Sequence, residues 1–94
     1  MKQARSLMKS RTTLSEGMFV EMVVWQVPAS VPGSLHCYKY RLALVSNGQC
    51  VLRYDNEAGK GDHKHIGGAE VPYTFQDLET LLKDFREDVE KWLP

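Results

Sequence analysis

The segment between Arg53 and His65 contains the residues whose types and spacing could do chemistry. It reads RYDNEAGKGDHKH and has almost no apolar residue after Tyr54. His63 and His65 are separated by one residue, so on an extended backbone both rings point the same way. Two imidazoles on one side can act as general base and general acid around a phosphodiester without a metal ion. We favour this metal-free interpretation and predict His63, His65 and Asp62 as the catalytic residues.

Polar and cationic side chains around the two histidines are predicted to hold the substrate. The predicted substrate-binding residues are Lys60, Lys64, Arg53, Asp55, Asn56, Lys39, Arg41 and Tyr54. The two lysines at positions 60 and 64 would stabilise the charge that builds on the phosphorane, and residues 53, 55 and 56 would form the floor of the site. Asp62, or Asp55 in its place, would hold one imidazolium.

Two other interpretations of the same segment stay open. The spacings Asp62-x-x-His65 and His63-x-His65 also suit a divalent metal ion, so the chain could be a phosphate-transferring enzyme that uses Asp55 and Asp62 with such an ion. A polar, glycine-rich stretch between a strand and a helix is most often an exposed loop. The chain would then be a non-catalytic binding module that docks on a protein partner through this loop or through an acidic helix.

Residues 38–41 alternate a tyrosine with a basic residue. The pattern permits RNA binding, with bases stacked on the rings. It is explained at least as well by rings that face the core and charges that face water. We also expect Trp25 and Trp92 in the core.

The C-terminal segment predicts one amphipathic helix over about residues 75–92. Its apolar residues recur at steps of three and four, as expected for one side of a helix. They are Phe75, Leu78, Leu82, Phe85, Val89 and Trp92. Thr74 is expected to cap this helix, with Asp77 three residues later in the manner of a capping box. One helix cannot bury such a stripe alone, so it should cover a sheet.

The preceding residues predict strands over about 5–14, 18–27, 36–45 and 49–56, followed by a polar loop over 57–69 with a possible short strand around His65–Ala69. The expected fold is therefore α+β: one domain over residues 1–94, with a four- to five-stranded, mainly antiparallel sheet covered on one face by the C-terminal helix.

Asn47-Gly48 predicts a two-residue hairpin turn between the third and fourth strands. In that register Val45 faces Cys50 and Ala43 faces Leu52. Positions 41 and 39 then face Tyr54 and Asn56 on the same side of the sheet. A single β-bulge would swap the two sides beyond it.

Composition bounds the possible functions. The chain has 94 residues with 12 Lys+Arg and 12 Asp+Glu, but residues 1–34 and 35–69 each carry a net charge of +2 and residues 70–94 carry −4. A neutral total argues against a surface that binds nucleic acid everywhere and leaves room for one basic patch.

No apolar run could span a membrane and residues 1–11 lack a signal-peptide core, which favours a cytoplasmic protein. Cys37 and Cys50 are expected to be free, small and buried.

The chain resembles the TumE family, formerly grouped as a domain of unknown function. The resemblance is carried by YKYRLA at residues 38–43, by VLRYDNEAGKGDHKHIG at 51–67, and by PYTF at 72–75 followed by Leu78 and Leu81-Leu82. It covers nearly the whole chain, and the run through GKGDHKH is long enough to be specific.

The resemblance implies a proteic toxin of a prokaryotic toxin–antitoxin module. Its partner would be an antitoxin, often a small helix-turn-helix protein, and its target would be RNA or translation. Combined with the two histidines, this predicts a toxin that acts on RNA as a metal-independent endoribonuclease, with no cofactor and no membrane partner. A homodimer is left open.

Overall fold

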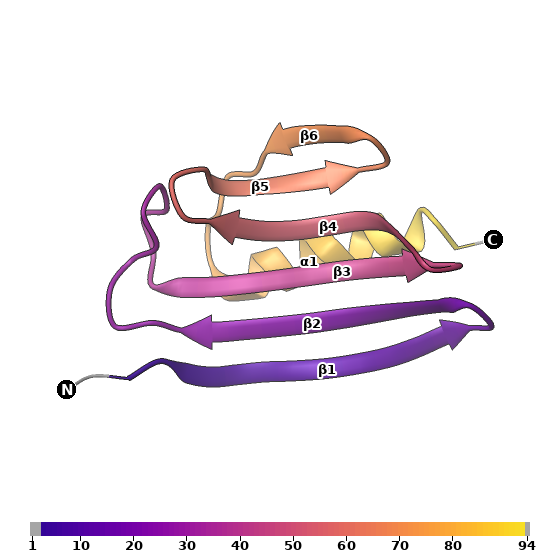
Figure 1. Ribbon diagram of the computed structural model, residues 1–94, viewed down its shortest axis with the longest axis horizontal. Helices are drawn as coiled ribbons and strands as arrows, with labels where there is room; N and C mark the ends of the chain where they lie inside the picture. The colour runs from indigo at the N-terminus through magenta and orange to yellow at the C-terminus, as the bar shows by residue number, and fades with distance from the viewer. Residues whose placement is uncertain (1–2, 94) are drawn as a thin grey trace.

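Within residues 3–93, which this computed structural model describes, six strands form one antiparallel sheet in chain order and one helix lies along one face of it (Figure 1). The elements are β1 (Arg5–Ser15), β2 (Met18–Gln26), β3 (Tyr38–Ser46), β4 (Gln49–Glu57), β5 (Gly61–Ile66), β6 (Ala69–Pro72) and α1 (Leu78–Glu90). Met1, Lys2 and Pro94 lie outside the described residues. The charge of Lys2 and the first two residues of the segment 1–11, which was predicted to lack a signal-peptide core, therefore lie outside them as well. The predicted α+β class, the antiparallel sheet and the C-terminal helix are confirmed.

The strand count was predicted too low, because most of the expected polar loop is a hairpin. β5 and β6 extend the sheet to six strands among the described residues, where four or five were expected. β5 reads GDHKHI and has a polar residue on both faces, so it lacks the apolar alternation by which a strand is predicted. Its backbone is nevertheless paired along its length with β4.

The helix is shorter than predicted and begins at a different cap. It spans Leu78–Glu90, and the side chain of Asp77 accepts a hydrogen bond from the Thr80 N–H at 2.7 Å. The predicted cap at Thr74 is therefore wrong, because Asp77 is the N-cap and accepts the hydrogen bond of a first-turn N–H that has no partner within the helix. Phe75 precedes the helix and stacks on the His36 ring, with 3.7 Å between ring centroids.

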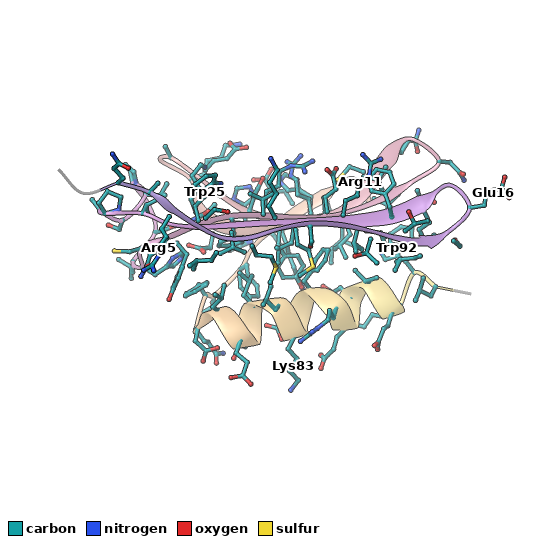
Figure 2. All side chains as sticks on the ribbon, turned by 90° about the horizontal axis from the view of Figure 1, so that it is seen from below. Arg5, Arg11, Glu16, Trp25, Lys83 and Trp92 are labelled. Carbon is teal, nitrogen blue, oxygen red and sulfur yellow. The ribbon has the colours of Figure 1, made fainter. Side chains whose placement is uncertain are left out.

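The core lies between the sheet and α1 (Figure 2). It is formed by Val24 from β2, Tyr40, Leu42 and Leu44 from β3, Leu52 and Tyr54 from β4, and Leu81, Phe85 and Val89 from α1. Each large apolar side chain buried here contributes about 1.5–3 kcal/mol relative to exposure. The tyrosines at 38 and 40 point to this side, as the core-facing explanation of their alternation with basic residues predicts.

A β-bulge decides which side chains of the β3–β4 hairpin face the core. Val45 pairs with Cys50, as predicted from the Asn47-Gly48 turn, but the register then shifts between Leu44 and Val45. Beyond the shift Ala43 pairs with Arg53, where the simple hairpin would have paired it with Leu52. The bulge sends the apolar side chains toward α1 and gathers the charged ones on the other face.

The opposite face of the sheet is called the open face here, because no helix within residues 3–93 covers it. Trp25 lies on this face and is 38% exposed, and Trp92 is 40% exposed, so both expectations of a core tryptophan are wrong. Cys37 and Cys50 are free, as expected, but both are exposed. Among the described residues, no helix is long and apolar enough to cross a membrane.

Candidate functional site

Five side chains of the open face form a cluster where β4, β5 and β6 lie side by side. Arg53 pairs with His65 and Asp55 with His63 across β4 and β5, and Glu70 of β6 pairs with His65. Because alternate residues of a strand share a face, this register places both imidazoles beside Arg53 and Asp55. These five residues are the open-face cluster. The prediction that His63 and His65 point the same way is confirmed, with 4.9 Å between ring centroids.

Asp55 is at the centre of the cluster. Its Oδ1 lies 2.8 Å from His63 Nε2, and its Oδ2 lies 3.0 Å from Arg53 Nε. Arg53 Nη2 lies 3.0 Å from His65 Nε2, so the guanidinium bridges the carboxylate and the second imidazole. The Glu70 carboxylate is farther away, at 3.7 Å from His63 Nε2 and 3.9 Å from His65 Nδ1.

The cluster contains buried polar atoms that lack hydrogen bonds. His63 is 4% exposed and Asp55 is 7% exposed. Their contact at 2.8 Å is close enough for an ion pair but does not have the direction of a hydrogen bond. Within the described part of the chain, the unsatisfied buried side-chain atoms are Arg53 Nε, Asp55 Oδ1 and His63 Nε2, all in this cluster. Buried polar atoms are normally paired, so this arrangement is typical of a site that receives another group.

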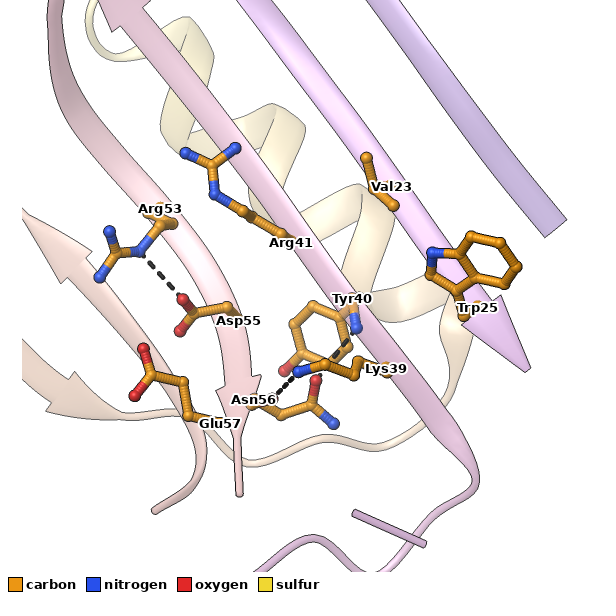
Figure 3. Close-up of a pocket in the computed structure, with 9 residues that line it drawn as sticks. All are labelled: Val23, Trp25, Lys39, Tyr40, Arg41, Arg53, Asp55, Asn56 and Glu57. Carbon is orange, nitrogen blue, oxygen red and sulfur yellow. Dashed lines mark hydrogen bonds and ion pairs between the residues drawn. The ribbon is translucent and has the colours of Figure 1, made fainter. Parts of the chain in front are cut away.

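A shallow groove of about 360 Å³ runs beside the cluster on the open face (Figure 3). It is lined by Val23, Trp25, Lys39, Tyr40, Arg41, Arg53, Asp55, Asn56 and Glu57. Three of these residues are cations. A second hollow, of about 440 Å³, lies on the other side of His63 and includes Lys60 and Glu70. The structure thus brings the predicted Arg53 and Asp55 against the histidines, places Lys39 and Arg41 in the same groove as these two residues, and places Lys60 in the hollow that His63 lines.

Asp62 lies away from both predicted histidines, because it alternates with them along β5. Its carboxylate accepts hydrogen bonds from Ser34 Oγ and Tyr40 Oη, each at 2.7 Å, and lies 2.7 Å from His36 Nε2. These four residues are the Asp62 cluster. The expectation that Asp62 orients His63 or His65 is therefore wrong: it pairs with His36, and Asp55 takes the place beside the predicted pair.

The Asp62 cluster fastens the connection between β2 and β3 to the start of β5. Gly33 of this connection packs against Gly61, and a Cβ on Gly33 would lie 2.7 Å from the Gly61 nitrogen. Gly61 has φ of +76°, a conformation that glycine adopts without strain. Burial, and then the hydrogen bond to Asp62, raise the pKa of Tyr40 above its usual range, so its hydroxyl remains a donor.

Three other predicted substrate contacts belong to the helix-covered face. Asn56 is fully buried, where its side chain accepts from the Tyr40 N–H and donates to the Tyr38 carbonyl. The Tyr54 hydroxyl donates to Asp88 of α1, and Lys64 Nζ lies 3.3 Å from the same carboxylate. The structure therefore separates the side chains of Tyr54 and Lys64 from the histidine pair, and it commits the side chain of Asn56, which also borders the groove, to hydrogen bonds with the backbone of β3.

The fold brings four further residues to these sites that were not predicted from the sequence. Glu70 and Glu57 lie beside the open-face cluster and its groove, and His36 completes the Asp62 cluster. Trp25 was assigned to the core and instead lines the groove. Only the strand register could have indicated Glu70 and Trp25, because it determines which residues share a face.

The fold and the cluster define a small α+β protein with an antiparallel sheet, one C-terminal helix, and a histidine–carboxylate–arginine centre on the open face. The sequence matches the family described as Toxin TumE over residues 3–93. The chain belongs to this family, which indicates a toxin of a toxin–antitoxin system with an antitoxin as partner. No curated protein matches the sequence, and no solved structure matches it.

Proposed function

We propose that this toxin cleaves RNA and that the open-face cluster is its catalytic centre. The observation that carries the proposal is the convergence of two imidazoles, a carboxylate and a guanidinium on the face that no described helix covers. Phosphodiester cleavage needs groups that move protons and a cation that stabilises the phosphorane. His63 and His65 are assigned to activate the attacking oxygen and protonate the leaving one, with Asp55 holding His63 and Arg53 stabilising the charge.

The groove beside the cluster supports RNA as the substrate. Lys39, Arg41 and Arg53 line it and could contact successive phosphates. Trp25 is 38% exposed there and offers a ring on which an unpaired base could stack. Lys60 lines the hollow on the other side of His63 and has a side chain that is 58% exposed, so it is assigned to a phosphate as well.

The remaining predicted residues are assigned structural roles. Asp62 holds the β2–β3 connection, and Tyr54 and Lys64 bind Asp88 on the helix side. Asn56 supports the backbone of β3. None of them is proposed to contact RNA.

The experiment that tests the proposal is RNA cleavage by the purified chain. His65→Ala should lower the cleavage rate by about 100-fold or more, because it removes one of the two proton-transferring groups. The melting temperature should stay nearly unchanged, since the side chain of His65 is 26% exposed and lies outside the core. Lys83→Ala, at an exposed position of α1, is the matched control and should cleave like wild type.

The rival interpretation is a toxin that acts by binding alone. A His65→Ala variant that is folded, binds the antitoxin and still arrests growth would favour it and contradict the catalytic proposal. The cytoplasmic location predicted from the sequence stays a prediction.

A further inference from the structure

Asp55 Oδ1 and His63 Nε2 are two buried atoms whose close approach requires a positive charge. They lie 2.8 Å apart, and neither makes a hydrogen bond. His63 Nδ1 lies 3.1 Å from the Gly61 carbonyl oxygen, which only accepts. Nδ1 therefore carries a hydrogen, and Nε2 either carries the second hydrogen of a charged ring or presents a lone pair. A carboxylate oxygen also presents lone pairs, so the two atoms attract each other only when a proton or a metal ion lies between them.

The direction of the contact distinguishes a proton from a metal ion. A shared proton must lie close to the line that joins the two atoms, and the Asp55–His63 contact does not meet that requirement. A metal ion lies off this line, where both lone pairs can point at it. With bonds of about 2.1 Å, two donor atoms at this separation subtend roughly 85° at the ion, close to the right angle between adjacent ligands of an octahedral ion.

A third donor and the local charge favour the ion. Asp55, His63 and His65 each offer one ligand atom, and these atoms all lie within 4.8 Å of one another. The hydrogen bond from His63 Nδ1 to a backbone carbonyl is the usual support of a metal-binding imidazole. Asp55 and Glu70 bring two negative charges to the cluster and Arg53 brings one positive charge, so the negative charge is in excess, which favours a cation.

We propose that Asp55, His63 and His65 bind one divalent transition-metal ion. Two imidazoles and a carboxylate suit zinc, cobalt, manganese or iron, whereas magnesium and calcium prefer oxygen ligands. The ion would lie at the edge of the basic groove, where it could polarise a phosphoryl oxygen. This consequence rests on the proposed RNA cleavage, in which the ion would take over the activation otherwise left to free imidazoles. The binding itself does not depend on it.

The test is metal binding by the full chain in the absence of RNA. Chelator-treated protein is titrated with ZnCl₂ by calorimetry and with CoCl₂ by visible absorption. We expect one ion per chain, a cobalt spectrum of nitrogen and oxygen ligation, and a higher melting temperature with the ion, since binding stabilises the folded state. Asp55→Asn and His63→Ala should each weaken binding by about 10-fold or more.

His36→Ala is the matched control, because it removes a histidine from the other histidine–aspartate pair and should bind like wild type. If His63→Ala does not fold, His65→Ala, with its partly exposed side chain, provides the same comparison. A wild-type chain that binds neither ion, or a His36→Ala variant that loses as much affinity as the cluster variants, would overturn the inference. Metal binding without RNA cleavage would overturn only the proposed function, and cleavage that persists in chelator with no bound ion would overturn only the role of the ion in cleavage.

Discussion

Two histidine–aspartate pairs of similar length lie on opposite sides of β5 and have different surroundings. In the Asp62 cluster, His36 lies 2.7 Å from the carboxylate, which also accepts hydrogen bonds from Ser34 and Tyr40. In the open-face cluster, His63 lies 2.8 Å from Asp55, and both contact atoms lack a hydrogen bond. The Asp62 carboxylate makes its hydrogen bonds and holds the β2–β3 connection in place. The contact atoms of Asp55 and His63 lack hydrogen bonds, and Asp55 lines the groove.

The difference shows that a residue pair does not by itself define an active site. A buried carboxylate with all its hydrogen bonds made contributes to stability, and its donors would become unsatisfied if it bound anything else. A buried carboxylate with an unsatisfied oxygen contributes less to stability and can receive a ligand. Function is therefore expected at Asp55 and stability at Asp62, which can be tested separately.

The largest expected difference between the two pairs is in toxicity. Expression of the wild-type chain without its antitoxin should arrest growth, and His63→Ala should abolish the arrest because it removes a proposed catalytic group. His36→Ala removes only a partner of Asp62 and should arrest growth like wild type. Colony counts after induction, with protein levels checked, measure both. Arrest by the His63 variant at normal expression would show that the open-face pair is not the functional one.

The free energy of unfolding should follow the opposite order. Asp62→Asn should destabilise the chain by about 2–3 kcal/mol, because the hydroxyl and imidazole donors around it lose their carboxylate. Asp55→Asn should cost less than Asp62→Asn, since Asp55 Oδ1 has no hydrogen bond to lose and its ion pair is with Arg53, whose side chain is partly exposed to solvent. Urea denaturation of both variants at neutral pH measures the difference. Equal losses would mean that the two carboxylates are both structural.

Asp88 extends the comparison to a third carboxylate, one that joins α1 to the sheet. Burial acts to raise its pKa, but hydrogen bonds from Tyr54, Lys91 and Lys64 outweigh burial and hold the pKa below its usual range. The ionised form is thus favoured by folding, so its contribution is present above about pH 4 and is lost as the pH falls through the lowered pKa. Asp88→Asn should cost about 1–2 kcal/mol at pH 7.

The pH dependence provides the control for this variant. The difference in unfolding free energy between wild type and Asp88→Asn should shrink when urea denaturation is repeated near pH 3. A difference that stays constant with pH would mean that the charge of Asp88 contributes nothing.

The smallest expected effects concern RNA binding in the groove. Lys39→Ala and Arg41→Ala should each weaken RNA binding and lower the slope of log affinity against log salt by about one unit. Lys83→Ala, on the opposite side of the molecule, should leave the slope unchanged. Fluorescence anisotropy over a salt series measures these slopes. Loss of binding confined to the helix variant would favour the binding-module interpretation.

The sequence predicted the elements that have an apolar side and missed those that do not. The first four strands and the helix lie close to their predicted positions, because their apolar residues repeat with the period of a strand or a helix. β5 was assigned to a loop because its side chains are polar on both faces. Its pairing with β4 comes from the backbone, which the residue types do not indicate.

The two histidines of the candidate site were predicted from the sequence, but only some of the residues that surround them were. His63 and His65 were found from their spacing, since alternation along an extended chain holds whatever the sheet does. Asp62 was placed before Asp55 as the partner of an imidazole because it is a neighbour in sequence, whereas the strand register makes Asp55, the stated alternative, the neighbour of His63 in space. The bulge between Leu44 and Val45 determines which side chains of β3 lie across from Arg53 and Asp55, and nothing in the residue types indicates it.

The most direct test of the account compares the two carboxylates in one reaction. The rate of RNA cleavage at saturating protein is measured for Asp55→Asn and Asp62→Asn, at a temperature where both variants are folded. We expect a rate at least about 100-fold below wild type for Asp55→Asn and within about 5-fold of wild type for Asp62→Asn. A rate lost only in the Asp62 variant, or lost equally in both, would contradict the assignment of catalysis to the open-face cluster.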